Sequence, residues 1–237
     1  MSLAKLPFIF SSAWSMHKTF TPPNVPPSAD EQAPSDVGED LLRTFTVWGT
    51  IVMKSACWAV ALSEAGALLS PYVSMPPSAP LAAQVGMLRQ LNAPTPVTPA
   101  FVIGSALMTA SGLLRWFCYR TLGRFFTFQL SVRKAHALVT DGPYSVVRHP
   151  SYTGALLGFI GVCMVHGSRT SWLRTSGVLD LTGVKALGVS AFSIYSLTVV
   201  CLGLRIPRED EMLHKRFRGE WEDWAHQVRY RLIPGIW

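Results

Sequence analysis

Charged side chains are scarce in this chain of 237 residues, because lysine, arginine, aspartate and glutamate together make up only 15% of it. Soluble domains usually carry about a quarter, whereas hydrophobic residues reach 49% here. This composition argues against an ordinary soluble domain and indicates an integral membrane protein. The net charge of +7 then indicates basic loops on the cytosolic side of a lipid bilayer. No pattern of interleaved basic and aromatic residues predicts a nucleic-acid partner.

Several motifs that carry chemistry are also missing. The cysteines stand far apart and form no Cys-x-x-Cys pair, so neither a disulfide framework nor a zinc site is indicated. The chain has no glycine-rich phosphate loop, no nucleophilic serine elbow and no His-Glu-x-x-His motif. We therefore expect no metal at the functional site.

What the sequence does contain is a series of apolar stretches. A membrane span needs about 20 residues, and the longer stretches reach this length. The first is short and bears some likeness to a signal peptide, but no clean cleavage site follows it, and we interpret it as a membrane helix. The sequence thus predicts an all-α bundle of about five transmembrane helices, at residues 3–20, 44–70, 97–119, 152–166 and 184–204.

Two segments between these stretches are rich in proline. Residues 21–43 also carry several acids and are predicted to form a surface loop. Residues 71–96 are predicted to form a second loop, with one short helix near residues 82–91. On this basis the chain divides into three parts, residues 1–43, 44–96 and 97–237.

Basic residues set the expected orientation. The connector at residues 120–148 and the tail at residues 205–231 are rich in lysine and arginine. Two spans separate them, so both lie on one side, and the positive-inside rule assigns that side to the cytosol. Lys54 and Glu64 interrupt the second span, and each is expected to face the bundle interior or to reach toward the membrane surface.

The tail has a helical pattern of its own. Pro207 is expected to kink the chain as it leaves the bilayer. Beyond it, large apolar residues recur at helical spacing. They predict a cytosolic C-terminal amphipathic helix carrying Met212, Leu213, Phe217, Trp221 and Trp224.

The most informative stretch precedes the fourth span. A turn and a proline-started helix explain its glycine and prolines, and interfacial anchoring partly explains Tyr144 and Tyr152. Neither explains the adjacent pair Arg148 and His149. Ionisable groups at the mouth of a membrane helix are costly and mark a candidate site. This stretch and the tail share one side of the membrane, which predicts a cytosol-facing cavity between helices.

Two motifs emerge from these segments. The first reads Gly142-Pro143-Tyr144, Arg148-His149-Pro150-Ser151-Tyr152 and Gly154. The second comprises Arg205, Glu209-Asp210, Leu213 and Phe217. Together, over roughly residues 97–237, they resemble the isoprenylcysteine carboxyl methyltransferases. The resemblance implies a multi-pass enzyme of the endoplasmic reticulum membrane with its active site facing the cytosol. Such an enzyme uses S-adenosylmethionine to methylate the C-terminal carboxylate of the prenylated cysteine of its client proteins.

The same resemblance implies roles for individual residues. Arg205 is the residue implied to meet the substrate, and Glu209 is the acid on the cofactor side; both are the implied catalytic residues. The sequence departs from the usual motif at Asp210, where a second glutamate is usual, and at Arg218, where a glycine is usual. The implied cofactor contacts are Gln129, His136, Ala137, Leu138, Val139, Tyr144, His149, Pro150, Ser151, Tyr152 and Glu209.

Other functions stay open on the sequence, because either motif alone is less specific. Phospholipid methyltransferases and membrane sterol reductases carry related Arg-His-Pro stretches. A phospholipid N-methyltransferase would need a base for its ammonium acceptor and would tolerate loss of Arg205. A sterol-type reductase would bind a nicotinamide cofactor instead. A catalytically silent scaffold is the remaining alternative, and the Arg205/Glu209 pair argues against it.

Overall fold

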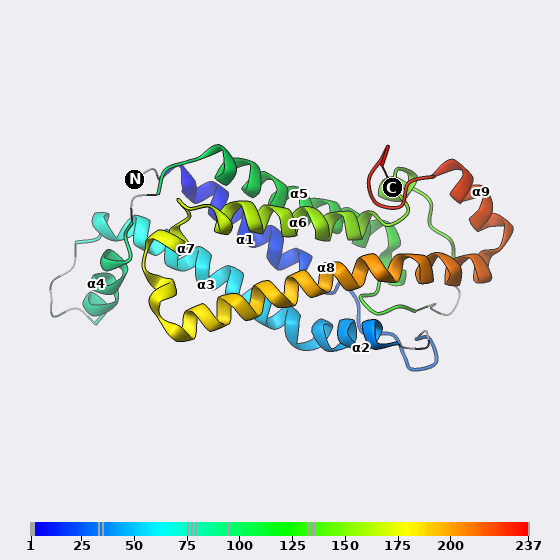
Figure 1. Ribbon diagram of the computed structural model, residues 1–237, viewed down its shortest axis with the longest axis horizontal. Helices are drawn as coiled ribbons and strands as arrows, with labels where there is room; N and C mark the ends of the chain where they lie inside the picture. The colour runs from blue at the N-terminus through cyan, green and yellow to red at the C-terminus, as the bar shows by residue number, and fades with distance from the viewer. Residues whose placement is uncertain are drawn as a thin grey trace.

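The computed structural model describes residues 3–32, 34, 36–74, 76, 78, 80–93, 95–131, 133 and 136–236. They form an elongated bundle of helices (Figure 1). Across these residues the only β pairing is an isolated bridge between Gln32 and Ser131, so the all-α prediction is confirmed. The helices of the bundle are α1 (Lys5–Thr19), α3 (Thr50–Leu69), α5 (Pro99–Leu122), α6 (Pro150–Gly167) and α8 (Thr182–Phe217).

Shorter helices lie around this bundle. The helix expected near residues 82–91 is present as α4. A π-helical turn, Phe45–Gly49, joins α2 to α3 and makes one long helical stretch. The shorter helices are α2 (Val37–Thr44), α4 (Ala82–Gln90), α7 (Trp172–Thr175) and α9 (Gly219–Gln227).

Three helical stretches of the described chain are long and apolar enough to cross a membrane: Val37–Tyr72, Pro99–Phe125 and Thr182–Phe217. They indicate an integral membrane protein. The predicted spans at α1 and α6 are helices of 15 and 18 residues, shorter than the roughly 20 that a span usually needs. Both nevertheless pack among the longer helices.

Small residues allow the central helices to approach closely. A Cβ atom added at Gly104 of α5 would lie 2.9 Å from the carbonyl oxygen of Gly161 in α6, and one added at Gly112 would lie 2.7 Å from the Cα of Ser15 in α1. Such contacts between backbones are typical of helices that associate in lipid, where packing rather than water exclusion drives association. Gly104 and Gly112, both in the predicted third span, therefore lie at helix interfaces.

Two sequence predictions require correction. Residues 37–43 were expected in a loop but belong to α2, because Asp36 caps the helix by accepting the backbone N–H of Glu39 at 2.8 Å. The tail does not form a separate amphipathic helix beyond Pro207, since α8 continues through that proline to Phe217. The predicted apolar stripe is instead divided between α8 and α9, with the break at Arg218.

Candidate active site

A cavity with several polar and charged side chains in its wall, called the polar cavity below, is lined by residues of α8, of α9 and of the segment that precedes α6. It encloses about 750 Å³ of space, part of it open to the exterior. Of the predicted site residues, Ala137 and Pro150 are outside its wall: Ala137 is exposed and Pro150 begins α6. The others are brought together in the wall, which includes Gln129, His136, Leu138, Val139, Tyr144, His149, Ser151, Tyr152, Arg205 and Glu209.

Asp210 organises the start of α6. Its carboxylate lies 3.0 Å from Nε2 of His149 and 3.2 Å from Nη1 of Arg148. Nε of Arg231, near the C-terminus, is also 3.2 Å away. The backbone N–H of His149 donates to the carbonyl of Arg231 at 2.8 Å. The Arg148-His149 pair that the sequence singled out is thus fixed by a buried acid on α8.

Glu209 and Arg205 face the same cavity from α8. The hydroxyl of Tyr152 donates to the Glu209 carboxylate, and Nδ1 of His149 lies 3.9 Å from it. Nε of Arg205 is 3.7 Å from Glu209. The arginine is buried, with 7% of its surface exposed. The predicted cation and anion are therefore neighbours, one turn apart on one face of α8.

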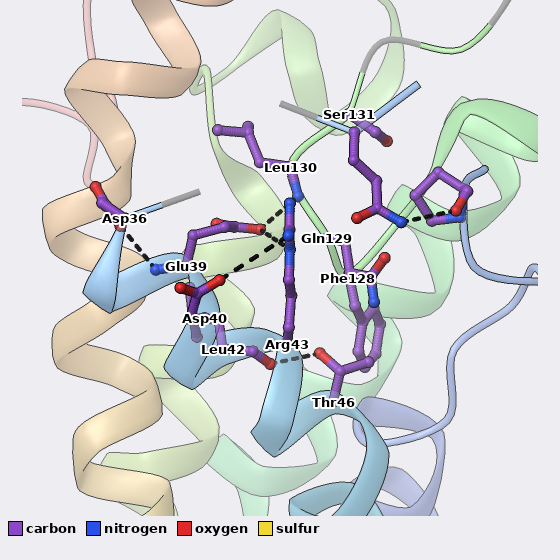
Figure 2. A network of polar contacts seen from close by, with 12 residues as sticks. Asp36, Glu39, Asp40, Leu42, Arg43, Thr46, Phe128, Gln129, Leu130 and Ser131 are labelled. Atoms are coloured by element: carbon purple, nitrogen blue, oxygen red, sulfur yellow. Dashed lines mark hydrogen bonds and ion pairs between the residues drawn. The ribbon is translucent and has the colours of Figure 1, made fainter. Parts of the chain in front are cut away.

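Two residues that sequence reasoning missed complete this arrangement. Glu39 of α2 lies 3.5 Å from Nη1 of Arg205, and its other oxygen accepts the N–H of Leu130 at 2.9 Å (Figure 2). Arg115 of α5 donates to the carbonyl and hydroxyl oxygens of Ser151 at 3.0 and 2.9 Å. For Arg115 the one available signal was a charge inside an apolar stretch. Glu39 gave no such signal, because it lies among other acids in a segment predicted as a loop.

The polar cavity offers groups that suit S-adenosylmethionine, which has a sulfonium, an amino group, a carboxylate and an adenine. Oε1 of Gln129 and Nδ1 of His136 are buried without a hydrogen-bond partner, and buried polar atoms normally have one. Glu209 is an anion for a cationic group, and Phe125 and Trp224 add apolar surface. This set of donors, acceptors and aromatic rings fits the cofactor.

Burial shifts the ionisation of two residues in the wall. Burial, aided by Arg216 and Arg133, lowers the pKa of His136, and its ring stacks on Phe125 with centroids 4.7 Å apart. Burial also raises the pKa of Tyr144 well above its usual value. Both side chains are consequently neutral at pH 7, so neither adds charge to a wall that contains Arg148, Arg205 and Glu209.

A second, apolar cavity adjoins the first. It encloses about 700 Å³, part of it open, and reaches toward α3 and the middle of α8. Its wall shares Phe126, Thr127, Ser151 and Tyr152 with the polar cavity. Most of the remaining wall is apolar, including Leu42, Phe45, Met53, Ala155, Ile194 and Leu202. The two cavities together form an amphiphilic site.

Comparison with known proteins finds similarity to methyltransferases and to proteins named for metal resistance. Residues 99–182 match the family model described as phospholipid methyltransferase. The protein-S-isoprenylcysteine O-methyltransferase B of Arabidopsis thaliana is 38% identical over 60 residues, which cover 24% of this chain and 30% of that protein. The nickel-cobalt-cadmium resistance protein NccN of Alcaligenes xylosoxydans xylosoxydans is 32% identical over 127 residues, covering 53% of this chain and 49% of that protein.

A further relative is the cobalt-zinc-cadmium resistance protein CzcN of Cupriavidus metallidurans, 44% identical over 62 residues that cover 26% of this chain and 27% of that protein. The chain thus spans at most about half the length of these three curated relatives. The resemblance read from the two motifs is confirmed at the level of the family. Parts of the chain are similar to the phospholipid methyltransferase family, over residues 99–182, and to an isoprenylcysteine methyltransferase, over 60 residues.

Proposed function

We propose that this protein transfers the methyl group of S-adenosylmethionine to the C-terminal carboxylate of a prenylated cysteine. The observation that supports this most is that the polar cavity, with Arg205 and Glu209 in its wall, adjoins the apolar cavity at Ser151 and Tyr152. An acceptor with a charged head and a hydrocarbon chain matches this pair of cavities. In this proposal, the predicted cofactor residues that line the polar cavity contact S-adenosylmethionine.

In this proposal Arg205 binds the acceptor carboxylate, because its planar guanidinium holds two carboxylate oxygens better than lysine does. A carboxylate is already ionised at neutral pH, so no general base is needed. When bound, S-adenosylmethionine supplies the methyl group of its sulfonium, and this methyl group passes to the carboxylate oxygen as the carbon–sulfur bond breaks. Glu209 pairs with a cationic group of the cofactor, and the backbone N–H of Ser151, at the start of α6, donates to an anionic one. The aromatic wall excludes water, which favours a step that neutralises charge.

The proposal also includes the membrane topology of the protein and its cellular location. α1 and α6 are counted with the three longer stretches as membrane helices, giving the predicted five spans. The basic segments 120–148 and 205–231 put the polar cavity on the cytosolic side. Prenylated client proteins reach the enzyme from that side, at the endoplasmic reticulum membrane. The apolar cavity receives the prenyl chain.

The variants that test this role are Arg205→Lys and Glu209→Gln, each keeping the size of the side chain. Arg205→Lys is expected to lower kcat/KM for a farnesylcysteine acceptor by about a hundredfold, the typical loss for one precisely placed donor. Glu209→Gln is expected to raise KM for the cofactor. Glu211→Gln, an exposed acid on the same helix, is the matched control and should match the wild type. Wild-type rates in both Arg205→Lys and Glu209→Gln would contradict the proposal.

A phospholipid amine is the second candidate acceptor, because the family model that matches residues 99–182 carries that description. An amine acceptor carries no carboxylate for Arg205 to hold. Phospholipid methylation that survives Arg205→Lys would therefore favour this candidate over the first.

A further inference from the structure

Arg205 has two acidic neighbours, and they differ in burial. The Glu39 side chain has 2% of its surface exposed and lies 3.5 Å from Nη1 of Arg205. The Glu209 side chain has 24% exposed, lies 3.7 Å from Nε, and lines the polar cavity. A fully buried charge is costly unless it stays paired, so Glu39 is the fixed counter-ion. Glu209, which reaches the cavity, is the acid able to turn toward a ligand.

Glu39 is itself held by its surroundings. One carboxylate oxygen accepts the N–H of Leu130 at 2.9 Å and lies 4.0 Å from Nε of Arg43, one turn along α2. Figure 2 shows Glu39 turned toward Leu130, with Arg43 and Gln129 nearby. Arg205 in turn donates from Nη1 to the carbonyl of Phe128 at 2.8 Å. Glu39 and Arg205 therefore both fasten the 128–131 loop, whose Gln129 lines the polar cavity.

The segment that carries Glu39 contacts other parts of the bundle at several of its described residues. We call residues 21–44 the N-terminal strap. Nδ2 of Asn24 donates to the carbonyls of Gly123 and Phe126 at 2.7 and 2.9 Å, and Arg208 of α8 pairs with Asp36. The strap thus connects α8 to the connector that forms the cavity wall.

We propose that Glu39 is a positioning residue for methyl transfer, which holds the Arg205 guanidinium and the 128–131 loop in place for the acceptor. The inference rests on the proposed function. It divides the two acids by role: Glu39 neutralises and orients Arg205, and Glu209 serves the cofactor. It also gives the proline- and acid-rich strap a part in the reaction, although the resemblance to the methyltransferases begins near residue 97.

The test compares Glu39→Gln with Asp40→Asn, in the intact protein reconstituted in lipid. The glutamine keeps the acceptor for the Leu130 N–H and removes only the charge. Asp40 is the neighbouring acid, with 63% of its side chain exposed. For farnesylcysteine methylation, Glu39→Gln is expected to lower kcat about tenfold, since a displaced positioning group costs this much or more. KM for the cofactor is expected to change less than about twofold, and Asp40→Asn should match the wild type.

Hydrogen exchange at the Leu130 amide gives a readout independent of activity. Exchange is expected to stay slow in Glu39→Gln and to accelerate in Glu39→Ala, which loses the acceptor as well. A wild-type kcat in Glu39→Gln would overturn the positioning role, and so would an equal loss in kcat and cofactor affinity, which indicates a collapsed site. A wild-type protein that binds the cofactor but leaves farnesylcysteine unmethylated would overturn the proposed function itself, and this inference with it.

Discussion

Single residues decide how much of the site could be predicted. Arg148 and His149 stood out because ionisable groups are rare beside apolar stretches, whereas the resemblance singled out Arg205 and Glu209. The structure brings all four together in the wall of the polar cavity. Glu39 did not stand out, because it lies among other acids in a segment that reads as a solvated loop. Only the need of a buried guanidinium for a fixed counter-ion identifies it, and that need is visible only once Arg205 is seen to be buried.

His136 makes a prediction about pH. Its pKa is lowered from 6.5 by burial first, then by Arg216 and Arg133, while Glu209 opposes the shift. Between the lowered pKa and 6.5 the unfolded chain binds a proton that the folded protein does not. The free energy of unfolding should therefore decrease as pH falls below about 6.5.

The measurement is the free energy of unfolding in detergent at pH 7.5 and 5.5. His136→Leu should show a smaller loss between the two pH values than the wild type. His226→Gln, which removes an exposed histidine, is the control and should lose as much as the wild type. An undiminished loss in His136→Leu would show that the histidine is not the titrating group.

At the level of elements, long apolar stretches were predictable and helix junctions were not. α5 and α6 follow the predicted spans within a few residues, because their apolar residues are continuous. α2 was missed, because the acids in its first turn, Glu39 and Asp40, resemble a polar loop although they favour a helix N-terminus. The passage of α8 through Pro207 was missed because proline usually bends or ends a helix.

α1 and α3 are joined by a buried ion pair that the sequence did not pair. Lys5 contacts Glu64 and also donates to the hydroxyl of Thr95 at 3.2 Å. Glu64 and Lys54 were each expected to face the bundle interior or to reach toward the membrane surface. Glu64 is buried, and Lys54 is half-buried. Because Lys5→Met leaves the Glu64 charge without its partner, it should destabilise the protein by about 3–5 kcal/mol.

The double variant Lys5→Met/Glu64→Leu removes both charges and should recover most of that loss. Lys215→Met, which breaks an exposed pair with Glu211, should leave thermal unfolding in detergent unchanged. A double variant as unstable as the single one would show that the loss does not come from the unpaired Glu64 charge.

Arg218 separates α8 from α9 with a φ angle of 48°, a conformation that glycine adopts without cost. The related motif usually has glycine here, and the chain keeps the break although the residue differs. Arg218→Gly should therefore raise the free energy of unfolding by about 1 kcal/mol, measured by denaturation in detergent. Arg218→Ala is the control: it removes the same side chain but keeps the Cβ, and should give no such gain. Equal stability in both variants would contradict the strain argument.

At the scale of the whole molecule, the described chain has two groups of buried charge, and Figure 1 shows the start of α1 and the end of α8 at opposite ends of the bundle. The Lys5–Glu64 pair lies toward the end of α1 nearest the N-terminus, and the Arg205 cluster lies toward the end with α9. Composition predicted the membrane class, and the motifs predicted the family. A cavity between helices was predicted, but not how it adjoins a second cavity, since this depends on how α2, α6 and α8 pack. Neither could the strap, whose contacts are between segments remote in sequence.

The measurement that tests the central proposal most directly is methyl transfer from labelled S-adenosylmethionine, in membranes containing this protein, with N-acetyl-farnesylcysteine and phosphatidylethanolamine offered together. The proposed function predicts base-labile label on the farnesylcysteine, as expected of a methyl ester, and its loss in Arg205→Lys. Label confined to the phospholipid would contradict the carboxylate acceptor and favour the lipid amine. Absence of label in both acceptors, with the cofactor bound, would contradict both.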